Sequence, residues 1–448
     1  MDTQEQSLHD PQKQARITQD QLDALCELHT RFIEGRLGGR RGVIQNLNLC
    51  GLSLAGRDLR QVDFSGCSMM EMDLSNTNFQ EARLYACDLS KSNLTRCNFL
   101  RSDLRGSRIE FANLEGANLN KADLRVGGIA REGDAYGAAK SANFKGANLS
   151  GAKLTGSLAG QAEFTDAIMS NVDIMGADLR DARMDGADLS NAKVVGANLV
   201  GAKLQDTILT GVDLSGMTEH DADFSSAITD ANVGLSVNEM DTPLVSQIES
   251  HRLWVETSGA EGEQIDLAGI DMRPLETLKE LKLTAVKAVG ARFFGMNLYK
   301  IEMQSSCLDK CDFRRCDMED GDFRGSTFKD ARLNHANLKN SDFTPLMFGN
   351  ALAEKRFSPS DFEGASLSYA DFSGCKLKSA NFKNADLTYT NFRGADLRDA
   401  DFTGARIDNV IFDDAQMDDV KMKPDGPIFK MKAEAEEEVA AEEGTGTE

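Results

Sequence analysis

The chain has 448 residues, with 50 Lys and Arg against 72 Asp and Glu, which gives a formal net charge of −22. Because no run of about 18 apolar residues occurs, the sequence excludes a membrane-spanning helix. The acidic balance also argues against a protein that grips nucleic acid through its phosphates. The opening residues lack the basic and apolar parts of a signal peptide, so we expect a cytoplasmic protein whose nine Cys stay reduced.

The N-terminal sequence indicates a polar segment followed by one helix. Residues 1–17 are polar, and we expect them to be disordered. Thr18 followed by Gln21 matches a capping box, and apolar residues then keep to one helical face as far as Gly35. We therefore expect a helix at 18–35, which would cap the repeat region that follows it.

From residue 47 onward the sequence repeats every five residues. Residues 112–124 read A-N-L-E-G, A-N-L-N-K, A-D-L, which is a small residue, Asp or Asn, Leu or Phe, and two polar or small residues. We call the large apolar residue of each five the centre. Centres keep a constant phase from Leu49 to Leu124 and from Phe144 to Phe224, and a second tract runs from Leu278 to Phe348. After a displacement of one residue, a third tract runs from Phe362 to Met422.

A period of five fits neither an α-helix nor a flat strand. The centre and the residue two before it are apolar or small, and positions two apart on an extended segment share a face. Each five therefore predicts a strand-like side with two inward residues, followed by a turn. Phe occupies every second centre of the last tract, and Phe79 and Phe99 are separated by four repeats. Since like residues stack evenly, a coil of four repeats, with one repeat to each of four sides, is the simplest arrangement.

These repeats resemble the pentapeptide-repeat family. The resemblance covers most of residues 47–234 and 265–423, across dozens of repeats in phase. It implies an all-β solenoid in which each array is a right-handed quadrilateral β-helix. The handedness is implied by the family alone. Each of the two arrays is expected to follow a short capping α-helix.

An acidic connector at 235–264 separates the two arrays, and it contains a second predicted helix at 243–258. Thr242 and Pro243 open this helix in the usual order of N-cap and first helical residue. Both helices carry a His-x-x-aromatic pattern, namely His29 with Phe32 and His251 with Trp254. We infer a duplicated unit, each copy being a capping helix followed by a β-solenoid.

Two stretches interrupt the arrays. Near 125–141 the five-residue phase continues but would place Asp134 inside, and a buried unpaired carboxylate is costly, so we expect an extruded loop. Near 344–359 the one-residue displacement of the centres predicts a bulge. Residues 424–448 form an acidic segment of low sequence complexity, and we expect this tail to be disordered.

No pattern of residues indicates catalysis or a metal. The five His are scattered, and the Asp before each centre is expected to face solvent, so we expect no enzyme, no cofactor and no metal site. Six Cys occupy the inward position two before a centre, where a thiol behaves as a small hydrophobe: Cys67, Cys87, Cys97, Cys311, Cys316 and Cys375.

The sequence favours a non-catalytic scaffold that binds other proteins, with no direct nucleic-acid or membrane partner and with a homodimer left open. The family resemblance offers an alternative, because some members mimic a DNA duplex and bind DNA gyrase or topoisomerase IV. Topoisomerase-protecting members carry extruded loops, which makes Arg131, Asp134 and Tyr136 the candidate contacts here. More than half of the acidic excess, −12 of −22, lies in residues 225–266 and 423–448, however, whereas a mimic needs a continuous negative surface.

Overall fold

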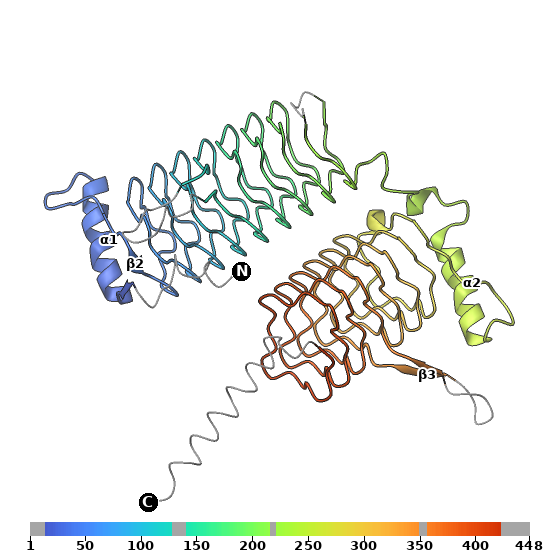
Figure 1. Cartoon of the computed structure of the whole chain (residues 1–448). Coiled ribbons are helices and arrows are strands. Elements are labelled where there is room, and N and C mark those ends of the chain that lie inside the picture. The colour runs from blue at the N-terminus through green and yellow to red at the C-terminus, as the bar shows by residue number, and fades with distance from the viewer. Residues whose placement is uncertain (1–13, 128–139, 216–220, 349–355, 423–448) are drawn as a thin grey trace, which may run out of the picture. The chain divides into compact units, whose positions relative to one another are not determined.

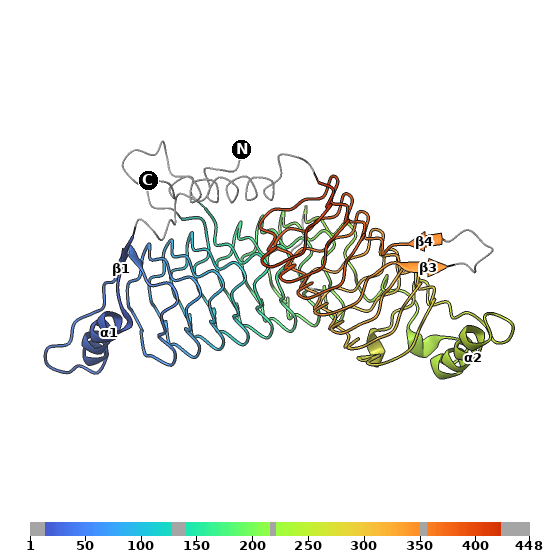
Figure 2. The same ribbon diagram turned by 90° about the horizontal axis from the view of Figure 1, so that it is seen from below.

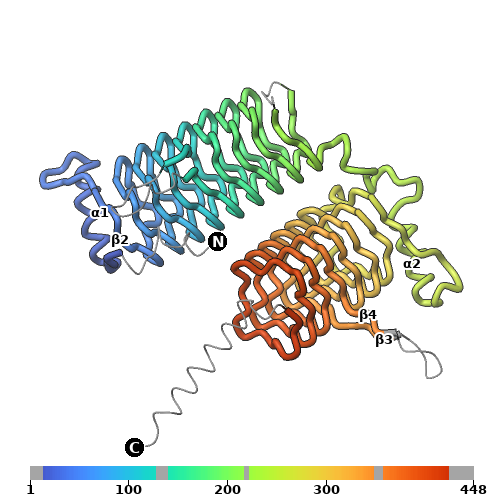
Figure 3. Tube along the Cα trace, in the orientation of Figure 1, coloured from blue at the N-terminus to red at the C-terminus, as the bar shows by residue number. Residues whose placement is uncertain are grey.

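The computed structural model describes residues 14–127, 140–215, 221–348 and 356–422. The chain divides into two compact units, Met1–Val233 and Gly234–Glu448. Figures 1 and 3 show each unit as a stack of similar coils with one helix near its start. Among the described residues, neither helix has the length and apolar character needed to cross a membrane.

Successive coils are joined by parallel backbone bridges between residues four repeats apart. Four such ladders run along each array, one repeat apart in the sequence, and the centres of the interior coils lie next to bridge residues, as Leu189 follows Asp188. The bridge spacing of 20 residues matches the four repeats per coil that the sequence predicts. In the first array the ladders begin with the bridges Val43↔Asp63, Asn48↔Ser68, Ser53↔Asp73 and Asp58↔Asn78.

Centres and the small residues two before them fill the interior. Leu189 and Ala187, for example, are 1% and 0% exposed. The predicted stacking of Phe over Phe is confirmed, since the rings of Phe79 and Phe99 lie 5.3 Å apart and 10° from parallel. Phe144 lies on the ring of Phe164 in the same way, at 5.0 Å. Each array thus has one continuous core, within which like rings stack from coil to coil.

Polar residues at the inward small position donate to the coil below. Cys67 Sγ donates to the carbonyl oxygen of Ile44 at 3.0 Å, and Thr77 Oγ1 donates to that of Leu54 at 2.8 Å. Burial raises the pKa of the Cys67 thiol to about 12, so this thiol is a buried hydrogen-bond donor and not a nucleophile. The prediction that the inward Cys act as small core residues is confirmed by their burial.

The Asp residues before the centres are not all exposed, and here the expectation from sequence was wrong. Asp88 and Asp188 are 1% and 3% exposed, and Asp63 is 5% exposed. Ser65 N donates to Asp63 Oδ1 at 3.0 Å, and the same bond recurs two residues after many of these Asp. Because the carboxylate satisfies a turn amide and is covered by neighbouring coils, burial at this position is compatible with charge.

The first unit opens with β1 (Ala15–Arg16), α1 (Gln19–Ile33) and β2 (Leu47–Asn48). The strand β1 pairs in parallel with β2, so the N-terminus expected to be disordered over 1–17 includes two paired residues. The capping box at Thr18 is present as predicted. Arg57 stands at an inward position but turns outward, and its Nη2 lies 2.7 Å from Asp23 Oδ1 on α1.

The second unit opens with η2 (Val237–Glu239), α2 (Leu244–Glu256) and η3 (Arg273–Leu275). The helix starts one residue later than the predicted 243–258 because Pro243 is the N-cap, and it ends two residues earlier because Thr257 is the C-cap. The first bridges of this array carry one extra residue per coil, as in Asp266↔Lys287, and the spacing returns to four repeats after η3.

The two helices make the same contacts through their His residues. Gly42 N donates to His29 Nδ1 at 2.9 Å, and His29 Nε2 lies 3.0 Å from the Arg60 carbonyl oxygen. In the second unit Ile265 N donates to His251 Nδ1 at 3.2 Å, and Nε2 lies 2.9 Å from the Thr284 oxygen. Because Nδ1 accepts in both cases, Nε2 must carry the proton, and both rings are held neutral. These matched contacts support the inferred duplication.

This arrangement predicts a pH dependence of stability. Burial lowers the pKa of His29 and of His251 in the folded chain. Their contribution is therefore complete above the unfolded pKa of about 6.5 and is lost as the pH falls through the folded value. Near His29, Asp58 opposes this shift and Arg41 adds to it. We expect thermal melting temperatures to fall between pH 7.5 and 5.5.

The double variant His29→Gln, His251→Gln isolates this effect, because Gln retains a donor and an acceptor but does not titrate in this range. We expect its melting temperature to change less over the same pH interval, as measured by circular dichroism. An unchanged pH slope would mean that other groups cause the dependence.

Both interruptions leave the ladders intact. The bridges on either side of the first join residues 35 apart, as in Arg108↔Asn143, and those beside the second join residues 34 apart, as in Thr327↔Asp361. Compared with the ordinary spacing of 20 residues, the first interruption adds 15 residues, which keeps the five-residue phase. The second adds 14, which produces the one-residue displacement of the centres. The second excess forms an antiparallel hairpin of β3 (Leu346–Phe348) and β4 (Arg356–Ser358), visible beside its coils in Figure 2. Phe348, predicted as a centre, is therefore a hairpin residue.

Candidate functional site

The predicted contact residues Arg131, Asp134 and Tyr136 lie outside the described residues. What the structure describes is the base from which their segment departs. Gly127 N donates to the Lys140 carbonyl oxygen and Lys140 N donates back to that of Gly127, both at 2.8 Å. This antiparallel pair closes the excess segment at its foot, so the chain re-enters the array without disturbing the coils.

Gly127 is required at this foot by close packing. A Cβ atom there would lie 2.8 Å from Tyr85 Cε2 and 2.9 Å from the backbone carbon of Arg105. The Arg105 guanidinium in turn lies 5.3 Å from the centre of the Tyr85 ring. The sequence located this interruption from the inward phase position of Asp134, which could not show which glycine meets the neighbouring coil.

A surface hollow of about 500 Å³ lies beside the loop foot, lined in part by Arg105, Arg125, Gly160 and Arg180. The ladder register explains it, because Gly160 occupies the row between Arg125 and Arg180 and lacks a side chain to fill the gap. Each Arg is held through Nε and Nη2 by the Asp two residues earlier, as Asp178 holds Arg180 at 2.8 and 2.7 Å. The hollow is therefore polar but carries little net charge.

The same two-bond ion pair between an Asp and the Arg two residues later recurs across both arrays and neutralises part of their surface charge. The residues before and after a centre point to the same side, so an Asp-x-Arg sequence forms a two-point ion pair. The bond from Arg180 lowers the pKa of Asp178. Eight such pairs occur among the described residues: Asp58–Arg60, Asp103–Arg105, Asp123–Arg125, Asp178–Arg180, Asp271–Arg273, Asp312–Arg314, Asp322–Arg324 and Asp396–Arg398.

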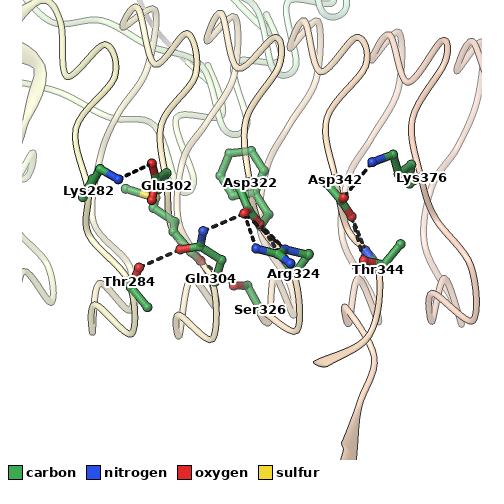
Figure 4. A network of polar contacts seen from close by, with 12 residues as sticks. Lys282, Thr284, Glu302, Gln304, Asp322, Arg324, Ser326, Asp342, Thr344 and Lys376 are labelled. Atoms are coloured by element: carbon green, nitrogen blue, oxygen red, sulfur yellow. Dashed lines mark hydrogen bonds and ion pairs between the residues drawn. The ribbon is translucent and has the colours of Figure 1, made fainter. Parts of the chain in front are cut away.

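The face of the second unit that carries the hairpin is covered by a polar network (Figure 4). Thr284 Oγ1 donates to Gln304 Oε1 at 2.6 Å, and Gln304 Nε2 donates to Asp322 Oδ2 at 2.6 Å. Arg324 clamps the same carboxylate at 2.9 and 2.7 Å. The network runs from coil to coil across the ladder, so it presents a fixed pattern of donors and acceptors.

The network continues to the residue from which the hairpin departs. Burial alone would raise the pKa of Asp342, but bonds from Thr344 and Lys376 lower it. Thr344 Oγ1 donates to Asp342 Oδ1 at 2.7 Å, and Lys376 Nζ donates to Oδ2 at 3.0 Å. Because Thr344 stands two residues before β3 and Lys376 lies in the next coil, these bonds fix the hairpin's exit.

The hairpin carries an exposed apolar pair. Met347 and Phe357 are 57% and 55% exposed, and they are direct partners in the β3–β4 register. Leu346 packs instead against the coil, since a Cβ added to Gly325 would lie 3.1 Å from its Cβ. The foot of the hairpin is thus anchored and its next residue pair faces solvent. The one-residue displacement of the centres located this element, but nothing in the sequence showed the pairing.

The ladders contain no long column of carboxylates among the residues that the structure describes. The longest acidic run is Glu302, Asp322 and Asp342, with Lys282 at one end and Lys376 at the other. Elsewhere amides and cations interrupt the acids. Asn98 Nδ2, for example, donates to Asn78 Oδ1 at 3.0 Å in one such column. No group of three His, Cys, Asp or Glu residues in the described part of the chain could hold a metal ion.

Comparison with known proteins gives one family. The model of pentapeptide repeats matches eight times, at residues 53–90, 82–120, 142–181, 182–216, 306–344, 356–394, 375–414 and 385–423. No curated protein matches the chain.

Solved structures with similar coils include HetL, a pentapeptide repeat protein involved in heterocyst differentiation regulation from the cyanobacterium Nostoc sp. strain PCC 7120. It is 18% identical, with 89% of this chain and 97% of that chain covered and a TM-score of 0.17. Rfr23 from the cyanobacterium Cyanothece 51142 is 31% identical over 28% of this chain and 88% of its own, with a TM-score of 0.18. A trypsin-treated variant of QnrB1 is 20% identical over 43% and 87%, with a TM-score of 0.27. These TM-scores are too low to carry an argument about partners.

Proposed function

This chain belongs to the pentapeptide-repeat family, and we propose that it is a non-catalytic scaffold that binds another protein through hairpin β3–β4 and the polar face beside it. Proteins of this family fold as right-handed quadrilateral β-helices, and we propose the same form for both arrays here, with α1 and α2 as caps. The proposal extends the four-ladder register and the packing of Leu22 and Cys26 on the first coils.

The observation that carries the proposed function is the exposed pair Met347 and Phe357. Centres in the interior coils are buried, so an exposed Phe and Met directly opposite each other on an anchored hairpin stand apart from the rest of the array. Aromatic and Met side chains surrounded by polar groups are typical of protein-binding surfaces. The network around Asp322 and Asp342 would supply the polar rim.

The test is affinity capture from the native cell extract with paired variants. We expect Met347→Ser combined with Phe357→Ser to lose a stoichiometric partner that the unchanged chain retains. The matched control is Val195→Ser, because Val195 is 54% exposed in the first unit and its replacement should leave binding unchanged. If the hairpin variant retained the partner, the contact would lie elsewhere on the chain.

A second candidate is modulation of a type II topoisomerase by mimicry of DNA. Some members of the family mimic a DNA duplex, and the antiparallel pair of Gly127 and Lys140 brackets the segment that holds the proposed contacts Arg131, Asp134 and Tyr136. The interrupted carboxylate columns disfavour this candidate, since mimicry needs continuous negative charge. A gyrase supercoiling assay with and without a quinolone is decisive, and we expect no change at micromolar protein.

A further inference from the structure

The last coil of the second array exposes its core. In the preceding coil Leu387, Phe392 and Leu397 are fully buried, and Phe402 is 2% exposed. In the last coil every core position is only partly buried. We call these side chains the C-terminal end face: Ala405, Ile407, Val410, Phe412, Ala415, Met417, Val420 and Met422.

The N-terminal end of the same array does not show this exposure. There α2 lies over the first coils, with His251 buried and Leu244 and Ile248 packed on the core. At the other end the described ladders stop at bridges such as Asp396↔Gln416 and Asp401↔Lys421. A solenoid end that presents an apolar cross-section and open strand edges needs a cover.

We propose that residues 427–432, Pro-Ile-Phe-Lys-Met-Lys, close the C-terminal end face of their own chain. They are the apolar segment nearest to Met422, and Ile428 follows it by six residues. Six residues span up to about 20 Å, which allows the segment to lie across the coil it leaves. In an extended segment Phe429 and Met431 share one side and Lys430 and Lys432 the other.

The charges around the end face fit this segment. The last coil carries five exposed carboxylates among its outward and corner residues: Asp408, Asp413, Asp414, Asp418 and Asp419. Asp408 pairs with Arg406 and Asp413 with Arg393, so Asp414, Asp418 and Asp419 form the acidic rim. Lys430 and Lys432 would meet this acidic rim while Phe429 and Met431 cover the apolar centre. Sequence outside the segment is unsuited to the task, because residues 433–448 hold seven Glu and no Lys or Arg.

The same charges disfavour a second copy as the cover. Two identical end faces brought together would place one acidic rim against the other, and like charges in contact are repulsive. Each copy would also bring its own run of Glu at 433–448. A tethered segment acts at a high effective concentration, so closure within one chain is favoured on both counts.

The direct test places a photo-crosslinking benzoylphenylalanine at Phe429 in the full chain. We expect a crosslink within one chain, mapped by mass spectrometry to residues 405–422. A crosslink between chains would overturn the proposal in favour of end-to-end association, and the absence of any crosslink to 405–422 would overturn it as well. The matched control carries the same group at Val439 and should give no such product.

Two shortened chains provide an independent measurement. A chain ending at Lys432 keeps the segment and loses the acidic run, and we expect it to melt and sediment as the full chain does. A chain ending at Met422 should melt at a lower temperature or associate, since the end face is uncovered. Identical melting and sedimentation of the two shortened chains would show that residues 427–432 cover nothing.

Discussion

Replacing Leu189 by Asp is expected to lower the free energy of unfolding of the first unit by roughly 3–5 kcal/mol, because it leaves an uncompensated charge inside the coil stack. Leu189 is 1% exposed, and its backbone N–H donates to the Ile208 carbonyl oxygen at 2.8 Å. The position cannot turn outward without breaking that ladder bond. Denaturant unfolding followed by circular dichroism would measure the loss.

The matched control is Asp188→Asn, one residue earlier. Asp188 is itself buried, at 3% exposed, yet its Oδ1 accepts bonds from the N–H and the hydroxyl of Ser190. Asn keeps an oxygen at the same place, so we expect a change near zero despite the burial. Similar losses in both variants would contradict the assignment of inward and outward positions.

Which residues of each repeat face the core could be predicted from sequence alone, because the two apolar or small residues in every five lie on one face. This is why the burial of Leu189 and Ala187, and the stacking of Phe79 on Phe99, were expected and are found. Arg57 is an exception at an inward position, and its ion pair with Asp23 on α1 shows how the charge is accommodated.

Contacts between coils could not be predicted in the same way. Whether an Asp before a centre is covered depends on its neighbours in the adjacent coils and on the turn amide that it binds, which is how Asp88 and Asp188 come to be buried. The displacement of the centres showed that an excess lay near 344–359, but its pairing as β3 and β4 follows from tertiary register. The exposure of Met347 and Phe357 follows only from that pairing.

The Phe columns of the second array make one residue, Phe382, especially important for stability. The Phe382 ring lies 5.0 Å from the rings of both Phe362 and Phe402, nearly parallel to each. It also meets Phe372 and Phe392 edge-on, at 6.2 and 5.6 Å. One ring therefore joins three successive coils and contacts the column on the opposite side of the coil, which concentrates packing energy at that position.

We expect Phe382→Ala to cost about 3–5 kcal/mol in the free energy of unfolding of the second unit, because the cavity interrupts one column and also removes the edge-on contacts with Phe372 and Phe392 of the other. Phe382→Leu is the matched control, since Leu is already the centre in the alternating columns, as at Leu387. It should cost less than about 1.5 kcal/mol. Equal losses for Ala and Leu would show that ring-on-ring stacking, rather than volume, holds the column, because only then would a shape-compatible aliphatic side chain be no better than a void.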